Sequence, residues 1–254
     1  MSIEREFEID GLPEIDVRIQ SGRVELVKGE PGRVRVTVDT SDRDFVVEQR
    51  GDLIVVASDK NTSWLARGSA FVVIAAPESS DAVIATASAR VESQIPLGHV
   101  EVKTASGDVE IESAQAADIK TASGDARIGS TKKTLRFKSA SGDLSVTESC
   151  EGTATFASAS GDIHINQADA ALDVNTVSGD VIIPRFGGQK AGLKSMSGNI
   201  RLGIPAGTKL DLDASLLSGK LHLPEPQKET TTTRRHMSIR AKLVSGDLLI
   251  DRVD

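Results

Sequence analysis

Hydrophobic and polar residues alternate along most of the chain with a period of two. In residues 155–165, Phe156, Ile163 and Ile165 fall on one side of the alternation, whereas Thr155 and His164 fall on the other. Successive side chains of a β-strand point to opposite faces of a sheet, so this alternation is typical of strands and not of helices. The pattern predicts an all-β protein.

A short motif interrupts the alternation at nearly constant intervals. It is Ser-Gly, usually followed by Asp, and the spacing between neighbouring copies is nearly uniform except for a longer interval between the last two. Such a short, regular period is typical of a solenoid, in which each repeat buries its apolar face by stacking on its neighbours. Every copy reads in the same direction, so neighbouring copies should pair as parallel strands. The copies begin at Ser106, Ser123, Ser141, Ser160, Ser178, Ser197, Ser218 and Ser245.

Each repeat is interpreted as a strand, a Gly-Asp corner, a second strand and a return segment. The prediction is therefore a parallel β-helix, or β-solenoid, with coils of about 18–19 residues. Ser88-Ala89-Arg90 fits the motif with Ala in place of Gly and precedes Ser106 by one repeat length, so the repeats should begin near residue 82. We expect residues 1–81 to form a less regular, strand-rich part that caps the solenoid, and residues 82–254 to form the repeats.

Two segments break the alternation, and a third spells a known recognition tripeptide. Residues 61–70, which include Trp64, should form a loop or a short helical turn, and residues 224–237 a polar surface insertion between the last two coils. Arg50-Gly51-Asp52 matches the integrin-recognition tripeptide. Because Gly-Asp pairs are common in turns, we interpret it as a turn between two strands.

Composition and charge exclude several classes of partner. With a formal net charge of −7 and 3% aromatic residues, the chain lacks the concentrated positive charge and the stacking rings that nucleic-acid binding requires. No apolar run approaches the roughly 20 residues of a membrane-spanning helix. Residues 1–7 do not resemble a secretory signal, and the single cysteine, Cys150, cannot form an internal disulfide. We expect a cytoplasmic protein.

The corner residues are the first candidates for chemistry. Stacked coils would hold their carboxylates about 4.8 Å apart, close enough to share cations. Calcium requires six to eight oxygen ligands, however, and the glycine-rich nonapeptide of calcium-binding β-rolls is absent. We therefore predict that the acidic column caps corner backbone N–H groups and that it forms no metal site. The predicted corner pairs are Gly107 and Asp108, Gly124 and Asp125, Gly142 and Asp143, Gly161 and Asp162, Gly179 and Asp180, Gly198 and Asn199, and Gly246 and Asp247, with Lys220 as the exception.

The corner serines and two histidines are the second set of candidates. The serines are interpreted as facing inward, and no base repeats beside them, so they should form structural hydrogen bonds rather than act as nucleophiles. His164 and His222 share an outward position, and we place them three coils apart, too far for one metal ion. The sequence predicts no catalytic residue and no cofactor.

The Thr-Ala-Ser-Gly-Asp and Ser-Ala-Ser-Gly-Asp units, preceded by an irregular strand-rich part that contains Val73 to Pro77, resemble a known family. It is the bacterial β-strand-repeat family of unknown function that is often labelled "putative adhesin". The resemblance covers nearly the whole chain. It implies a β-solenoid, and the family has no established catalytic residues.

Three classes of function are compatible with this pattern. A non-enzymatic structural or binding solenoid, presenting a repetitive surface to a protein or polysaccharide, fits best because repeat-encoded surfaces are regular. The first alternative is a carbohydrate-active enzyme. A basic outer face suggests it, but no unique pair of carboxylates, as glycoside hydrolysis requires, is set among these basic residues. The second alternative is a self-assembling cytoskeletal solenoid. The basic residues are Lys103, Lys120, Arg136 and Lys138.

The end of the predicted stack bears on the oligomeric state. The final coil, Leu243 to Ile250, is followed by Asp251 and Arg252, whose charges should discourage open-ended stacking. We therefore expect a monomer or a closed dimer.

Overall fold

The computed structural model describes residues 1–41, 45–58, 69–224 and 235–253, which form twenty-two strands and no helix. The prediction of an all-β protein is confirmed. Most of the predicted loop at 61–70 and most of the predicted insertion at 224–237 lie outside the described residues, although residues 69–70 and 235–237 belong to strands. The chain divides into two compact units, Met1–Ile128 and Gly129–Asp254.

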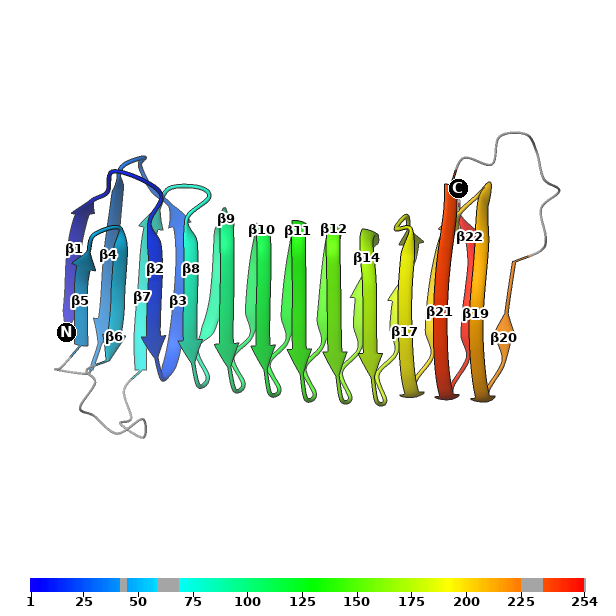
Figure 1. The fold of residues 1–254 in the computed structure, drawn as a ribbon. Helices are drawn as coiled ribbons and strands as arrows, with labels where there is room; N and C mark the ends of the chain where they lie inside the picture. The colour runs from blue at the N-terminus through cyan, green and yellow to red at the C-terminus, as the bar shows by residue number, and fades with distance from the viewer. Residues whose placement is uncertain (42–44, 59–68, 225–234, 254) are drawn as a thin grey trace. The chain divides into compact units, whose positions relative to one another are not determined.

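The first unit combines antiparallel and parallel strand pairs (Figure 1). Antiparallel pairs join β1 to β4, β4 to β7, and β5 to β6. Parallel pairs join β2 to β6 and β8, β3 to β7 and β9, and β9 to β8 and β10. The strands are β1 Ser2–Glu8, β2 Glu14–Ile19, β3 Ser21–Lys28, β4 Arg33–Thr40, β5 Phe45–Arg50, β6 Leu53–Ser58, β7 Ser69–Ala76, β8 Asp81–Thr86, β9 Arg90–Thr104 and β10 Val109–Thr121.

The strand register of this unit follows the sequence repeat. Val91 pairs with Val109 and Val102 with Ile119, so each residue lies beside its counterpart in the next repeat. The antiparallel pairs involve strands that end by residue 76, whereas β8, β9 and β10 pair in parallel. The boundary near residue 82 stays a prediction. Residues 50–52 lie at the turn of the β5–β6 hairpin, as their Gly-Asp pair indicated.

In the second unit the paired strands run parallel. Leu144 pairs with Ile163 and Cys150 with Ala168, and both partners lie one repeat further along the chain. The strand β11, Ala126–Ser139, begins just before this unit. The others are β12 Leu144–Ser158, β13 Ile163–Ile165, β14 Gln167–Thr176, β15 Val181–Ile183, β16 Arg185–Phe186, β17 Lys190–Ser197, β18 Ile200–Pro205, β19 Thr208–Ser218, β20 Leu221–His222, β21 Arg235–Ser245 and β22 Leu248–Val253.

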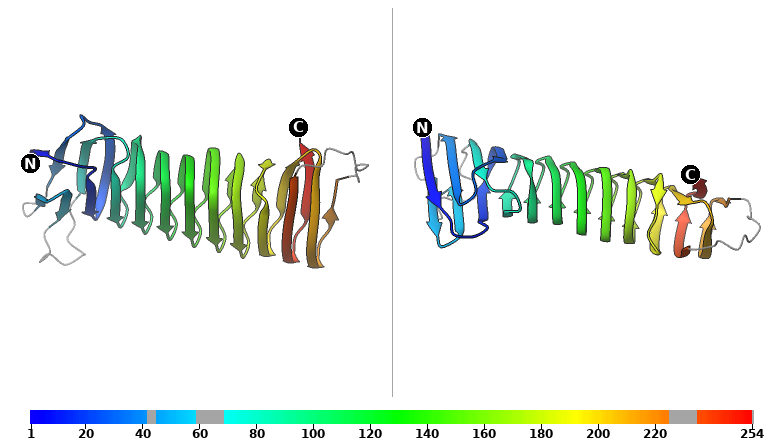
Figure 2. Two further views of the ribbon diagram at one scale, coloured as in Figure 1. Left: turned by 45° about the horizontal axis from the view of Figure 1, so that its top comes forward. Right: turned by 90° about the horizontal axis from the view of Figure 1, so that it is seen from above.

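The C-terminal strands of the second unit are not stacked in chain order. β21 pairs with β17 on one side and with β19 on the other, and β22 likewise lies between β18 and β20. In Figures 1 and 2 the red-orange β21 accordingly runs between the yellow β17 and the gold β19. The expectation that the coil Leu243 to Ile250 ends the stack is therefore wrong. The terminal coil is the one formed by β19 and β20, and the longer spacing between Ser218 and Ser245 leaves enough chain to step back across it.

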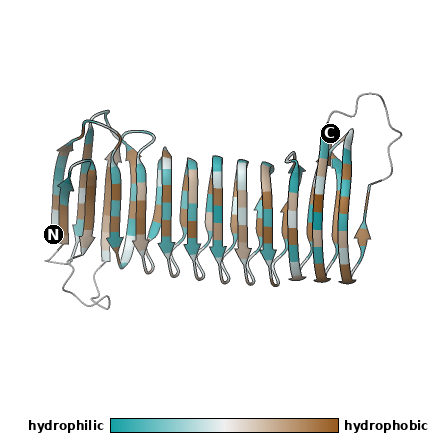
Figure 3. Cartoon of the chain, viewed as in Figure 1, coloured by the Kyte–Doolittle hydropathy of each residue, from teal (hydrophilic) through white to brown (hydrophobic). Residues whose placement is uncertain are grey.

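Hydrophobic and polar residues alternate along the strands, as the banding in Figure 3 shows, and the buried hydrophobic residues form the core of each unit. Phe137, Phe156 and Phe186 are fully buried, and most other core residues are Val, Ile, Leu or Ala. The corner serines, in contrast, do not face inward as predicted, since Ser160 and Ser178 are exposed. The strands β12 and β14 end two residues before Ser160 and Ser178, so the alternation stops there and these two serines lie in turns.

Replacing Ile128 by Asp should abolish the cooperative unfolding transition. Ile128 is fully buried, and an unpaired buried carboxylate outweighs the roughly 1.5–3 kcal/mol gained by burying the native side chain. Replacing the exposed neighbour Arg127 by Asp should leave the melting temperature nearly unchanged. Thermal unfolding followed by circular dichroism measures both, and equal melting temperatures would show that the inward and outward positions are misassigned.

Candidate functional site

The corners begin with a hydroxyl side chain that lies shortly before the glycine. Thr104 Oγ1 accepts a hydrogen bond of 2.8 Å from the Gly107 amide, and Ser158 Oγ accepts one of 2.8 Å from the Gly161 amide. Sequence reasoning missed this role, although the recurrence of Ser or Thr at this place before the glycine could have indicated it. The same bond recurs at Thr121, Ser139 and Thr176.

The corner glycines stack so closely that no side chain fits between them. A Cβ atom on Gly161 would overlap the carbonyl oxygen of Gly142, and one on Gly179 would overlap that of Gly161. Neither Gly161 nor Gly179 has a positive φ, so space and not backbone conformation requires glycine. The contact continues through Gly198, Gly246 and Gly219, and in the first unit it joins Gly107 to Gly124.

The residues after these glycines form a hydrogen-bonded ladder. Each side-chain oxygen accepts a hydrogen bond from the backbone N–H of the equivalent residue in the next coil. The Asp108 carboxylate receives the Asp125 amide at 3.1 Å in the first unit. In the second unit the donors and acceptors run from Asp143 through Asp162, Asp180, Asn199 and Asp247 to Lys220, with lengths of 2.7–3.0 Å.

Lys220 is the last member of this ladder in the second unit. Its backbone amide donates to Asp247 at 2.7 Å, but its side chain has no oxygen that could accept a further amide. The exception noted in the sequence therefore lies in the terminal coil, where β20 pairs with β22. The ladder ends at Lys220, since this side chain has no acceptor for a further amide.

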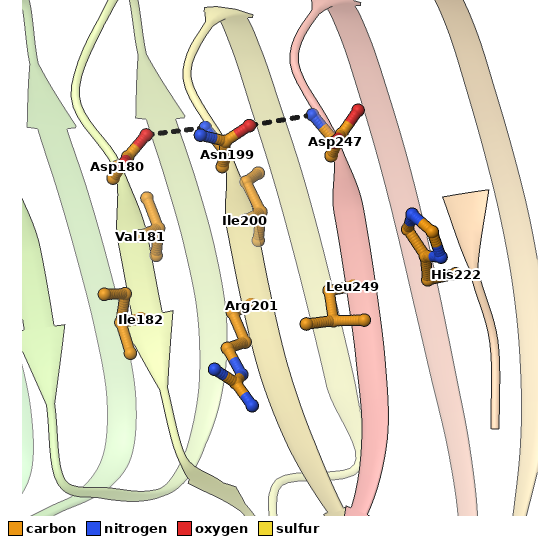
Figure 4. Close-up of a pocket in the computed structure, with 9 residues that line it drawn as sticks. All are labelled: Asp180, Val181, Ile182, Asn199, Ile200, Arg201, His222, Asp247 and Leu249. Carbon is orange, nitrogen blue, oxygen red and sulfur yellow. Dashed lines mark hydrogen bonds between the residues drawn. The ribbon is translucent and has the colours of Figure 1, made fainter. Parts of the chain in front are cut away.

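A groove of about 490 Å³ lies beside this ladder in the second unit (Figure 4). Its outward side chains form a row, in which Ile182 pairs with Arg201, Arg201 with Leu249, and Leu249 with His222. The groove combines apolar, basic and amide or carboxylate groups. Its other side is lined by Asp180, Asn199 and Asp247.

Most polar groups of the groove already have structural partners. Asp180, Asn199 and Asp247 each accept a backbone amide. Arg201 donates to Asp251 at 3.2 Å. Among the described residues no group of three or more His, Cys, Asp or Glu could hold a metal ion.

The two candidate histidines are further apart than predicted. His164 pairs with Ile182, and the row then continues through Arg201 and Leu249 to His222, which is exposed. His164 and His222 therefore lie four coils apart and not three, because the C-terminal coil is inserted between them.

Two basic residues of the predicted outer face are paired with carboxylates in the first unit. Lys103 lies 2.7 Å from Glu101, and Lys120 lies 3.4 Å from Glu101 and 3.3 Å from Asp118. The hydrogen bond from Lys103 helps to hold the pKa of Glu101 below its usual value. Arg136 and Lys138 are exposed and belong to the second unit.

A second cluster of charges in the first unit consists of two neighbouring columns, with Arg23 beside Arg90 in one and Glu92 between Glu25 and Glu110 in the other. Arg23 contacts Glu25 at 2.7 Å and also Glu92, and Arg90 contacts Glu92 and, at 3.0 Å, Glu110. The hydrogen bond from Arg23 lowers the pKa of Glu92. These partly exposed pairs each add little stability.

Cys150 is buried in the second unit. Burial raises the pKa of its thiol to about 11. Such a thiol stays protonated near neutral pH and is therefore a poor nucleophile.

Comparison with known proteins identifies the class of fold and then the family. A solved structure from Parabacteroides distasonis, described as a putative lipid binding protein, superimposes with a TM-score of 0.60 at 16% identity, covering 100% of this chain and 97% of that one. Another from Parabacteroides merdae, described as a putative adhesin, gives a TM-score of 0.49 at 12% identity, with coverages of 100% and 96%.

The fold is β-solenoid-like, and the chain belongs to the Toastrack DUF4097 family, which matches residues 12–253. The predicted membership of a β-strand-repeat family of unknown function is confirmed at this level. No curated protein matches the chain. The described residues contain no helix that is long and apolar enough to cross a membrane.

Replacing Gly161 by Ala should destabilise the second unit by roughly 1–3 kcal/mol, because the added methyl group would overlap a rigid backbone carbonyl. Chemical denaturation measures the change in the free energy of unfolding. Ser160→Ala is the matched control, since this exposed side chain contributes one bond of 3.3 Å to Ala140. A loss of stability no greater than in the control would contradict the close stacking.

Replacing Asp180 by Ala should cost about 1 kcal/mol, the net contribution of one hydrogen bond, because the Asn199 amide loses its acceptor. Asp180→Asn should retain most of this stability, since the amide oxygen of Asn199 fills the same role for Asp247. Denaturant titration compares the variants. If Asn costs as much as Ala, the carboxylate charge and not the hydrogen bond is what matters.

Proposed function

We propose that the protein is a non-enzymatic structural or binding protein whose repetitive outer surface contacts a protein or polysaccharide. The observation that carries the proposal is the state of its polar groups. Ladder side chains are occupied by backbone amides, and Lys103 and Lys120 are neutralised by acidic neighbours. Such groups can hydrogen-bond or pair with a ligand, but they do not form a nucleophile with an adjacent base.

The finer description of the fold follows the same reasoning. We infer that the coils form a parallel β-helix, because strands of successive repeats pair in parallel in both units. Each outward position then recurs once per coil, about 4.8 Å from its neighbours. A surface with this spacing suits an extended partner that can make the same contact several times.

The groove offers the second argument for binding. Two of its apolar side chains, Ile182 and Leu249, lie in one row with Arg201 and His222. This mixture fits a flat, partly polar ligand such as a sugar ring, whose hydroxyl groups need both donors and acceptors. A carbohydrate-active enzyme stays the alternative, and lipid binding enters the test because of the description that the Parabacteroides distasonis protein bears.

The test measures binding and cleavage separately. Biolayer interferometry with the purified full chain should detect retention of at least one member of a panel of bacterial polysaccharides. Size-exclusion chromatography should show that the retained polysaccharide keeps its chain length. Shortening of the chain would establish the enzymatic alternative, and binding to anionic phospholipid vesicles with no polysaccharide bound would replace the proposed partner by a lipid.

The groove supplies a matched pair of variants. Ile182→Asp adds a charge at a position that is 38% exposed and should therefore weaken polysaccharide retention without unfolding the chain. Val177→Asp changes an exposed apolar residue of the same unit that does not line the groove, and it should have no effect on retention. Equal losses in both variants would show that the groove is not where the polysaccharide binds.

A further inference from the structure

The terminal coil of the second unit exposes leucines at positions that are buried in the adjacent coil. Leu221 of β20 pairs in register with Leu248 of β22, yet Leu221 is 42% exposed and Leu248 is fully buried. Leu223 is 51% exposed, whereas its counterpart Ile250 is fully buried. The inward side chains of β19 are likewise only half-buried, although their partners on β21 are buried. Within the described part of the chain, no neighbour covers the far side of this coil.

The backbone of β19 also has an open edge. Among the described residues β19 pairs with β21 alone. The Ser238 amide of β21 donates to the carbonyl of Gln189, which precedes β17. The backbone amides and carbonyls of the odd-numbered β21 residues therefore point the other way, toward β19. In the parallel register that sets Met237 beside Leu210, the amides and carbonyls of the even-numbered β19 residues then point to the open side.

Lys220 excludes one occupant of this edge, a further coil of the same kind. A coil stacked in the manner of the others would place its corner amide over Lys220, which offers no acceptor. The amide would be left without a hydrogen bond, which disfavours such a coil. A second copy of this chain, added as another coil, is therefore disfavoured. An extended strand has no corner amide to place over Lys220, so the same objection does not apply to it.

The charges of β19 specify the chemistry of that strand. Asp211 and Asp213 point outward, and on the occupied side Asp213 receives Arg240 of β21 at 3.2 Å. Opposite charges on neighbouring strands stabilise a sheet, and like charges destabilise it. The same requirement on the open side calls for Arg or Lys facing these carboxylates, alternating with apolar residues that cover Leu210 and Leu212.

We propose that the open edge of β19 is a docking site for an extended segment of another protein, which adds to the sheet as a parallel strand. The segment alternates apolar residues with basic ones, as β21 does with Ile239, Arg240 and Ala241. Main-chain hydrogen bonds supply affinity in this mode of recognition, and the alternate side chains supply specificity. The site lies at the sheet edge and does not depend on the outer-face function proposed above.

The chain itself provides the probe. A synthetic peptide of residues 235–245 carries the sequence that already matches β19 in register. Fluorescence anisotropy with the labelled peptide and the full-length protein should show saturable binding with one peptide per chain. The same peptide with Arg240→Glu should bind at least tenfold more weakly, because Glu would face Asp213. Absence of binding at 100 μM peptide, on the order of the weakest affinities of such docking, overturns the proposal.

A proline variant locates the binding. Ala214→Pro removes one amide from the open edge, where proline is tolerated, and should weaken peptide binding at least tenfold. Ser215→Ala is the control, since it changes an exposed neighbouring side chain and keeps every backbone amide, and it should bind as the wild type does. If Ala214→Pro binds the peptide normally while keeping its melting temperature, the peptide enters elsewhere and the proposal fails. Reversible self-association of the wild type that Ala214→Pro abolishes would assign the edge to a second copy instead.

Discussion

The approach of one corner backbone to the next is the constraint on which each unit depends. At Gly161 and Gly179 there is no room for a Cβ atom, so any side chain there would push neighbouring coils apart from the spacing that the parallel ladder needs. Within a turn, the Ser158 hydroxyl accepts the Gly161 amide, and the Asp143 carboxylate of the preceding coil accepts the Asp162 amide. A turn of this kind has few unsatisfied polar groups although it is repeated many times.

This constraint also accounts for the roles of many polar side chains at the corners. Of the two columns considered as candidates in the sequence, the corner carboxylates accept backbone amides of the next coil. The corner serines Ser123, Ser160 and Ser178 donate to carbonyls of the preceding coil. What remains for a partner is the set of outward positions between corners, which the repeat copies from coil to coil. Recognition by such a surface depends on spacing and on repetition more than on any single residue.

Much of the fold could be predicted because each coil carries the same local sequence pattern. The alternation of residues such as Ile163, His164 and Ile165 fixes strands, and the motif spacing fixes parallel pairing. The order of the last coils could not be predicted in this way, because β21 matches β17 and β19 equally well in pattern. Lys220 was visible in the sequence as an exception, but only the pairing of β20 with β22 shows that it marks the end of the ladder. The groove was missed for the same reason, since Leu249 and His222 become neighbours only in that order.

The inserted C-terminal coil has a consequence for how the second unit is assembled during synthesis. Coils as far as β18 can add one after another, each onto a neighbour that already exists. β19 and β20 have no such neighbour when they are made, because the strands that separate them from β17 and β18 lie later in the chain, in residues 235–253. This later segment therefore joins β19 and β20 to the rest of the second unit. Until this segment folds, β19 and β20 cannot pair with the preceding coils in the way that the final structure has them. Its strands then insert between β17 and β19 and between β18 and β20.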